Sequence, residues 1–188
     1  MSAFSIVSRY SARMISRQTL PLLWLLSDAR NDTRLEAALR SLPRGSGFVF
    51  RHYHLDATAR RERFEALARL ARELGHLVIL AGDQDWGADG TYGKTRPVGP
   101  GLQLATAHDE AEIRAAAESG ADAIFLSPVF PTSSHPGAPT LGIERFHALA
   151  QRSPVPVIAL GGMTHERARE LDWPRWGAID GLPSTKSA

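Results

Sequence analysis

Short apolar runs alternate with segments of helical periodicity along most of the chain, and this alternation constrains the fold more than any other feature. The amphipathic stretch Thr58–Leu74, for example, places Phe64 and Leu67 on one helical face and charged residues on the other. The apolar runs have the length of strands buried on both faces. They lie at Leu22–Leu26, Gly47–His54, His76–Ala81, Leu102–Thr106, Ala121–Leu126, Pro156–Leu160 and Trp176–Gly181. Strand–helix–strand repeats of this kind give parallel strands with right-handed crossovers, so the chain is predicted to be an α/β protein.

The number of strands favours a closed barrel. Seven runs and an eighth short strand around Gly90–Tyr92 predict a (β/α)₈ TIM barrel. Such a barrel must be compact in 188 residues, since TIM barrels usually take about 200 or more. Gly82–Gly101 is rich in glycine and proline without helical periodicity, so we expect the helices after strands three and four to be shortened or missing. An open doubly wound sheet is the alternative, but it would need a glycine-rich turn after the first strand, and Ser27–Arg30 contains no glycine.

Length and composition predict one barrel domain over residues 21–188, preceded by a loose N-terminal extension over residues 1–20. The extension contains three arginines and no acidic residue, which resembles a transit peptide in composition, but it lacks the apolar core of a secretory signal. The absence of cysteine excludes disulfides and thiolate metal sites and fits a reducing compartment, so we expect a cytoplasmic protein. A net charge of +2 without a basic stripe argues against a nucleic-acid partner, and no apolar stretch is long enough to span a membrane.

Hydroxyl and imidazole side chains follow the strand Ala121–Leu126. The loop after it contains Thr132, Ser134 and His135 among several prolines, which cannot continue a strand or enter a helix. Ligands of parallel α/β proteins bind at the carboxyl ends of the strands. These three residues are therefore predicted to bind substrate; the alternative is an ordinary proline-rich surface loop.

Two further strand ends contain candidate site residues. Gly161 and Gly162 lie between a strand and a helix, where free backbone N–H groups favour a phosphate, although a tight turn without a ligand is the alternative. Thr106 and His108 end the strand that begins at Leu102. His108 could act as a general acid or base, or could bond to backbone at the start of the next helix.

The end of the second strand and of the third are polar. Alternation along a strand would place Arg51 and Tyr53 on one face and His52 and His54 on the other. Arg51 is a candidate catalytic residue, and Tyr53 is a candidate substrate-binding residue. Neither histidine is directly flanked by an acidic residue and the chain has no cysteine, so no zinc site is predicted. Asp83 and Asp85 could bind Mg²⁺, but in a glycine-rich loop they could equally be turn residues.

Three motifs together resemble those of the thiamine-phosphate synthase/TenI family. They are SPVFPTSS at Ser127–Ser134, PVIALGG at Pro156–Gly162 and ATAH at Ala105–His108, and the resemblance extends from about Leu22 to Gly181. It implies a TIM barrel that binds a phosphorylated thiazole and a phosphorylated pyrimidine, and it leaves a homo-oligomer open. The synthase of this family joins pyrimidine pyrophosphate to thiazole phosphate with Mg²⁺. The TenI-type relative is a thiazole tautomerase that uses a histidine and no metal.

The resemblance assigns roles residue by residue. It implies that Arg51 is the arginine that ends strand two, that Asp83 is a metal-associated carboxylate, and that His108 matches the tautomerase histidine. The remaining matches contact substrate: Thr106, Thr132, Ser134 and the phosphate-binding turn at Gly162.

The chain also departs from the synthase pattern at charged positions. Tyr53 and His135 replace lysines, Gly93–Arg96 is basic where a second metal carboxylate is expected, and Asp180 follows strand eight. Ionising a pyrophosphate ester requires its charge to be neutralised by metal and cations, so these changes predict reduced or altered synthase activity and leave Mg²⁺ binding open. Three hypotheses follow: a synthase-type transferase, a tautomerase with His108 as general acid/base, and a binder of a thiamine-related phosphate without turnover.

Overall fold

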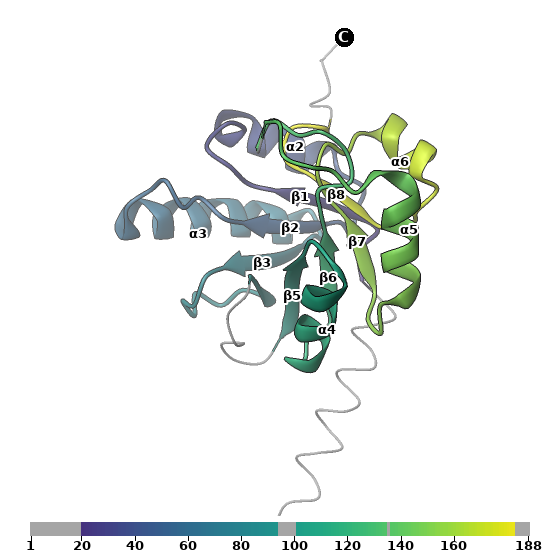
Figure 1. The fold of residues 1–188 in the computed structure, drawn as a ribbon. Coiled ribbons are helices and arrows are strands. Elements are labelled where there is room, and N and C mark those ends of the chain that lie inside the picture. Colours follow the sequence, from purple (N-terminus) through teal and green to yellow (C-terminus); the bar gives the residue numbers. More distant parts are fainter. Residues whose placement is uncertain (1–19, 94–100, 135, 183–188) are drawn as a thin grey trace, which may run out of the picture.

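A computed structural model of the chain, which describes residues 20–93, 101–134 and 136–182, shows eight parallel strands in a closed barrel (Figure 1). The strands are β1 (Leu23–Leu26), β2 (Gly47–Phe50), β3 (Leu77–Ala81), β4 (Gly90–Tyr92), β5 (Leu102–Ala107), β6 (Ala123–Leu126), β7 (Val157–Ala159) and β8 (Trp176–Ala178). Around them lie the short 3₁₀ helix η1 (Asp32–Arg34) and the helices α2 (Leu35–Ser41), α3 (Ala57–Glu73), α4 (Glu110–Glu118), α5 (Gly142–Arg152) and α6 (His165–Leu171). The predicted TIM barrel is confirmed. The alternative of an open sheet is wrong, because β8 pairs with β1, with Gly177 opposite Trp24.

Successive side chains along each strand point alternately into the barrel interior and towards the surrounding helices. In β6, Ala123 and Phe125 point into the barrel interior, whereas Ile124 and Leu126 pack under the helices. The Phe125 ring packs edge-on against Trp24 at 5.6 Å between ring centroids. Trp24 leaves no room at the neighbouring strand, where a Cβ on Gly47 would lie 2.1 Å from its ring. The interior is therefore a packed core, and a ligand can bind only at an end of the barrel.

The barrel is built from few residues because the connection between β3 and β4 contains no helix. Gly82–Asp89 connects β3 to β4 through bends and turns, as the sequence predicts. Residues 94–100, which follow β4, lie outside the described residues. Most of the predicted N-terminal extension lies outside them too, and its last residue, Leu20, is buried in the barrel interior. No described helix is long and apolar enough to cross a membrane.

One strand ends earlier than predicted. β2 stops at Phe50, because the backbone N–H of Arg51 donates to Ser27 Oγ at 2.7 Å and His52 takes a left-handed φ of 36°. The chain therefore turns at residues 51–54, and the prediction that their side chains alternate between two faces of a strand is wrong. His52 becomes fully buried, whereas Tyr53 is one of the most exposed large side chains at 66%.

Candidate functional site

A cavity of about 730 Å³ opens at the carboxyl ends of the strands. Its floor includes Tyr92, Leu160 and Ala178, and its walls come from the loops after β2, β5, β6, β7 and β8. Of the predicted site residues, it brings together Arg51, Thr106, His108, Thr132, Ser134, Gly161 and Gly162. This volume is typical of a small-molecule site.

The loop after β6 is held firmly at the cavity wall by backbone hydrogen bonds. Val129 N–H donates to Leu160 O at 2.9 Å, and Phe130 N–H donates to Gly161 O at 3.1 Å, which tie the loop to the turn after β7. Thr132 and Ser134 lie beyond this anchored part and line the cavity. A ligand there would meet hydroxyl groups on a restrained backbone.

The turn at Gly161 and Gly162 requires glycine. Gly162 has a φ of 65°, and a Cβ at this position would lie 2.4 Å from the backbone oxygen of Pro131. The turn therefore packs directly against the loop after β6. Its phosphate-binding role stays a prediction.

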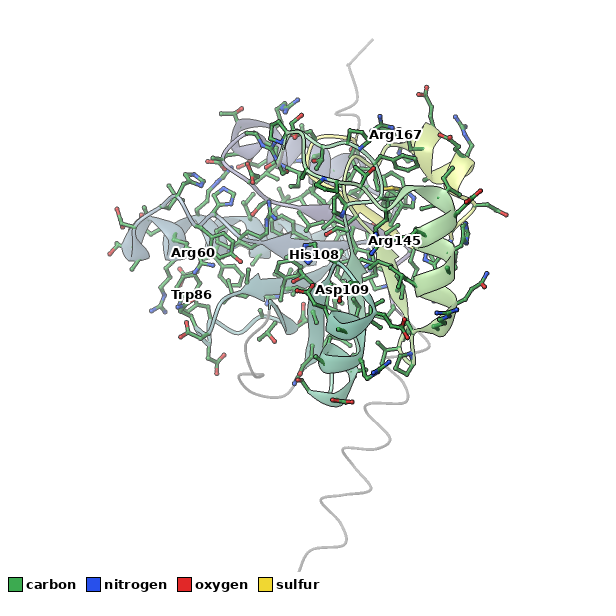
Figure 2. All side chains as sticks on the ribbon, viewed as in Figure 1. Arg60, Trp86, His108, Asp109, Arg145 and Arg167 are labelled. Atoms are coloured by element: carbon green, nitrogen blue, oxygen red, sulfur yellow. The ribbon has the colours of Figure 1, made fainter. Side chains whose placement is uncertain are left out.

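His108 forms a pair with Glu112, one turn further along the chain. His108 Nδ1 lies 2.7 Å from Glu112 Oε2, which also accepts the backbone N–H of His108 at 2.9 Å. The His108 side chain is 51% exposed, and Figure 2 shows it near the middle of the view, next to Asp109 at the start of α4. A carboxylate at Nδ1 favours the tautomer with the proton on that nitrogen, so Nε2 is left with a lone pair for proton transfer.

Arg51 is positioned by the loop after β1. Its Nε donates to Ser27 O at 2.9 Å, and its Nη2 donates to Asp28 Oδ2 at 2.8 Å. Burial would raise the pKa of the Asp28 carboxyl, but the hydrogen bonds and charge of Arg30 and the charge of Arg51 together lower it. Asp28 therefore stays ionised and aims the guanidinium of Arg51 at the cavity wall.

The sequence analysis missed two arginines that line the cavity, Arg145 on α5 and Arg167 on α6 (Figure 2). Arg145 is exposed, whereas the Arg167 guanidinium lies 5.2 Å from the centre of the Phe130 ring and donates to Gly162 O. Both lie near the start of a helix that follows a site loop. An arginine at such a place is a usable signal, because the helix dipole disfavours a cation there.

Asp180 also lines the cavity, but its charge is compensated. Arg30 Nη2 lies 3.5 Å and Arg34 Nη2 lies 3.7 Å from its carboxylate oxygens. Arg30 Nη2 also donates to Ser134 Oγ at 2.8 Å, so it connects the loops after β1, β6 and β8. A carboxylate here would repel a phosphate, but these two arginines, which the sequence analysis did not consider, offset its charge.

Two predicted site residues lie elsewhere, and a third is not described. Tyr53 is not among the cavity residues, and its ring lies 5.6 Å from the guanidinium carbon of Arg60. Asp83 is exposed, and its carboxylate accepts a hydrogen bond from the Gln84 side chain. Figure 2 shows Arg60 on the opposite side of the view from Arg145. His135 lies outside the described residues.

The Mg²⁺ that the family resemblance implies does not fit the described donor set at the cavity. The carboxylate among the described lining residues is Asp180, which is paired with arginines. Asp85 accepts the backbone N–H of Gly87 within its own loop, as a turn residue does. Because Mg²⁺ needs carboxylate oxygens that are free to bind it, we assign no protein-held Mg²⁺ here.

The histidines after β2 do have an acidic partner. His52 Nε2 lies 2.9 Å from Asp32 Oδ1, although Asp32 precedes His52 by 20 residues. The partner was not visible from the local sequence, because the parallel pairing of β1 and β2 brings η1 and the turn after β2 together.

Comparison with known proteins finds the family whose motifs the sequence resembles. The family described as thiamine monophosphate synthase matches residues 94–172. The thiamine-phosphate synthase of Pyrococcus furiosus is 26% identical over 165 residues, which cover 79% of each chain. That of Myxococcus xanthus is 42% identical over 87 residues, 45% of this chain and 38% of the relative. These matches confirm the resemblance to the thiamine-phosphate synthase/TenI family that the motifs predicted.

The solved structure of thiamine phosphate pyrophosphorylase from Pyrococcus furiosus supports the fold. It superposes with a TM-score of 0.70 over 87% of this chain and 86% of its own, at 23% sequence identity. The matches to four of the curated relatives cover 27–41% of the relatives' own lengths. The part of this chain matched best to the family holds the walls formed by β5, β6 and β7, which include His108, Thr132 and Gly162.

Proposed function

We propose that the chain is a transferase of the thiamine-phosphate synthase type that acts in thiamine biosynthesis. The observation that supports this most is that one cavity of about 730 Å³ holds Arg51, the hydroxyls of Thr132 and Ser134, and the Gly161–Gly162 turn. The resemblance to the family supplies the substrates, a pyrimidine pyrophosphate and a thiazole phosphate. The cavity has room for two small ligands side by side.

In the proposed reaction, the bond between the pyrimidine methylene carbon and the pyrophosphate oxygen breaks, and the oxygen keeps the electron pair. The lone pair of the thiazole nitrogen then forms the new carbon–nitrogen bond, and pyrophosphate leaves. Charge develops on the leaving oxygen, so donors aimed at it lower the barrier. Arg51 and Arg145 supply cationic donors, and Thr132 and Ser134 supply neutral ones. The turn at Gly162 holds the thiazole phosphate.

The test is product formation from both substrates, with and without Mg²⁺, followed by chromatography of thiamine phosphate and by release of pyrophosphate. Arg51→Met should lower kcat/KM by about 10²–10³. Arg61→Met is the matched control, because Arg61 is exposed on α3 and pairs with Glu65. If calorimetry shows that the wild-type protein binds both ligands but no product forms, the transferase hypothesis is wrong. The chain would then be a binder without turnover.

A thiazole tautomerase is the second candidate, and the His108–Glu112 pair favours it. A partly exposed imidazole held by a carboxylate in the cavity wall has what a proton shift on a thiazole carboxylate requires. This reaction needs no Mg²⁺. Calorimetry with thiazole phosphate carboxylate and with pyrimidine pyrophosphate separates the candidates: binding of the thiazole alone, unaffected by Mg²⁺, would favour the tautomerase.

A further inference from the structure

A second cluster of polar side chains lies away from the cavity, between η1 and the turn after β2. Asp32, His52 and His54 place one ligand atom each within 4.8 Å of one another. Among the described residues that line the cavity, none of these three appears. It is the one group of three such side chains found in the described part of the chain.

The buried member of the cluster has an unpaired ring nitrogen. The His52 side chain is fully buried, and its Nδ1 lies 2.7 Å from Ser27 Oγ. Its Nε2 lies near Asp32 Oδ1, but among the described residues it makes no hydrogen bond of acceptable geometry. A buried polar nitrogen without a hydrogen bond is costly unless it binds something.

The backbone conformation that positions the His52 ring is unfavourable for a residue other than glycine. His52 has a left-handed φ of 36°, which is uncommon for a residue other than glycine, and its ring stacks on Phe50 with 4.6 Å between ring centroids. His54 follows two residues later, with its ring 5.0 Å from that of His52. His54 is exposed, so its imidazole can rotate towards the other two ligands.

The local charge favours a cation although an arginine is present. Arg63 binds Asp32 Oδ1 at 2.8 Å, and it also pairs with Glu36. Two carboxylates therefore face one guanidinium, which leaves about one negative charge at the cluster. The contacts of the described residues to the Asp32 carboxylate fall on Oδ1, so Oδ2 is available to a ligand.

We propose that Asp32, His52 and His54 bind a transition-metal dication of the Zn²⁺ class. Two imidazoles and one carboxylate are ligands that suit Zn²⁺, whereas Mg²⁺ prefers oxygen alone. A tetrahedral Zn²⁺ holds its ligand atoms about 3.4 Å apart, so closing the site requires mainly a rotation of His54. Ser27 is the hydrogen-bond partner that orients the bound His52 through Nδ1.

The site would stabilise the turn that follows Arg51. Arg51 precedes His52, and its backbone N–H donates to the same Ser27 Oγ that contacts the His52 ring. A metal bound there would therefore restrain the residue that supports the cavity wall, without touching the substrate.

The test is a titration of the full-length chain, free of affinity tag and treated with chelator, with Co²⁺ and then Zn²⁺. We expect one equivalent of Co²⁺ to give the visible absorption of a tetrahedral site, and Zn²⁺ to displace it. Mg²⁺ should not compete. Zn²⁺ should also raise the melting temperature, because it binds the folded state.

His54→Ala is the decisive variant, because His54 is exposed and its loss should leave the fold intact, as circular dichroism would check. It should weaken binding at least about tenfold and abolish the rise in melting temperature. His165→Ala, a change at another exposed histidine, is the matched control and should bind as wild type does. The proposal is overturned if wild-type protein binds no Co²⁺ or Zn²⁺, or if His54→Ala binds them as well as the control.

Discussion

Two histidine–carboxylate pairs with similar distances between their atoms lie in different surroundings. His108 lies 2.7 Å from Glu112 in the cavity wall with half of its side chain exposed, and His52 lies 2.9 Å from Asp32 with none of its side chain exposed. The first pair can exchange protons with solvent and ligand. In the second pair the histidine is closed off from solvent. Burial lowers the pKa of His52, and burial raises the pKa of Asp32 less than the contacts with His52 and Arg63 lower it. Solvent access, more than distance, therefore separates a reactive pair from a structural or metal-binding one.

The largest expected effect is on the exposed pair and concerns turnover. If His108 transfers a proton, His108→Ala should lower kcat by about 10²–10⁴. If His108 only helps to bind pyrophosphate, kcat/KM should fall about tenfold through a higher KM, with kcat unchanged. Steady-state kinetics with each substrate pair measure the difference. His147→Ala is the control, because His147 bonds to Leu171 O between α5 and α6; wild-type kinetics in His108→Ala would remove this histidine from both candidate reactions.

The next effect is on the buried pair and concerns stability. His52→Ala removes a fully buried ring that stacks on Phe50 and contacts Ser27 Oγ, so we expect a loss of about 3 kcal/mol in the free energy of unfolding. Urea denaturation in the presence of chelator measures it. His108→Ala should change stability by less than about 0.5 kcal/mol. Equal losses in the two variants would contradict the contrast drawn between the pairs.

A smaller loss is expected for the carboxylate of the buried pair. Asp32→Asn keeps the shape but removes the charge that Arg63 and His52 contact, so a loss of about 1–2 kcal/mol in the free energy of unfolding is expected. Asp85→Asn is the control, because Asp85 is exposed and accepts a hydrogen bond within its own turn. A change at Asp32 as small as that at Asp85 would mean that solvent already screens the cluster.

The smallest effect belongs to the carboxylate of the exposed pair. Glu112→Gln should cost at most about 0.5 kcal/mol of stability, as an exposed pair on a helix does. Glu110→Gln on the same helix, which breaks an exposed pair with Arg114, should cost the same. The two variants should differ in activity if Glu112 orients His108. The pH profile of kcat should then shift in Glu112→Gln and stay unchanged in Glu110→Gln.

Much of the barrel was predictable because its signals are local. Apolar runs and helical periodicity located the strands and helices, and the glycines and prolines of Gly82–Asp89 correctly predicted a crossover without a helix. Thr132, Ser134 and Gly162 were predicted to face a ligand because each lies in a loop at the carboxyl end of a strand, and they line the cavity together. The roles of these residues remain predictions.

The errors arose where neighbours in space are distant in sequence. Tyr53 was placed beside Arg51 by strand alternation, but β2 ends at Phe50 and the ring lies outside the cavity. Arg145 and Arg167 were missed because each lies within a helix, where a charged residue is usually interpreted as part of the solvent-exposed face.

The sequence by itself determined the alternation of strands and helices, and with it the carboxyl-end loops on which a ligand must bind. Only the tertiary structure decided which polar groups meet: Asp32 with His52, Arg30 with Asp180, and Arg51 with Asp28. The physical reason is that hydrophobic periodicity acts within one element, whereas these contacts depend on the closure and register of the barrel, which bring the ends of separate strands together.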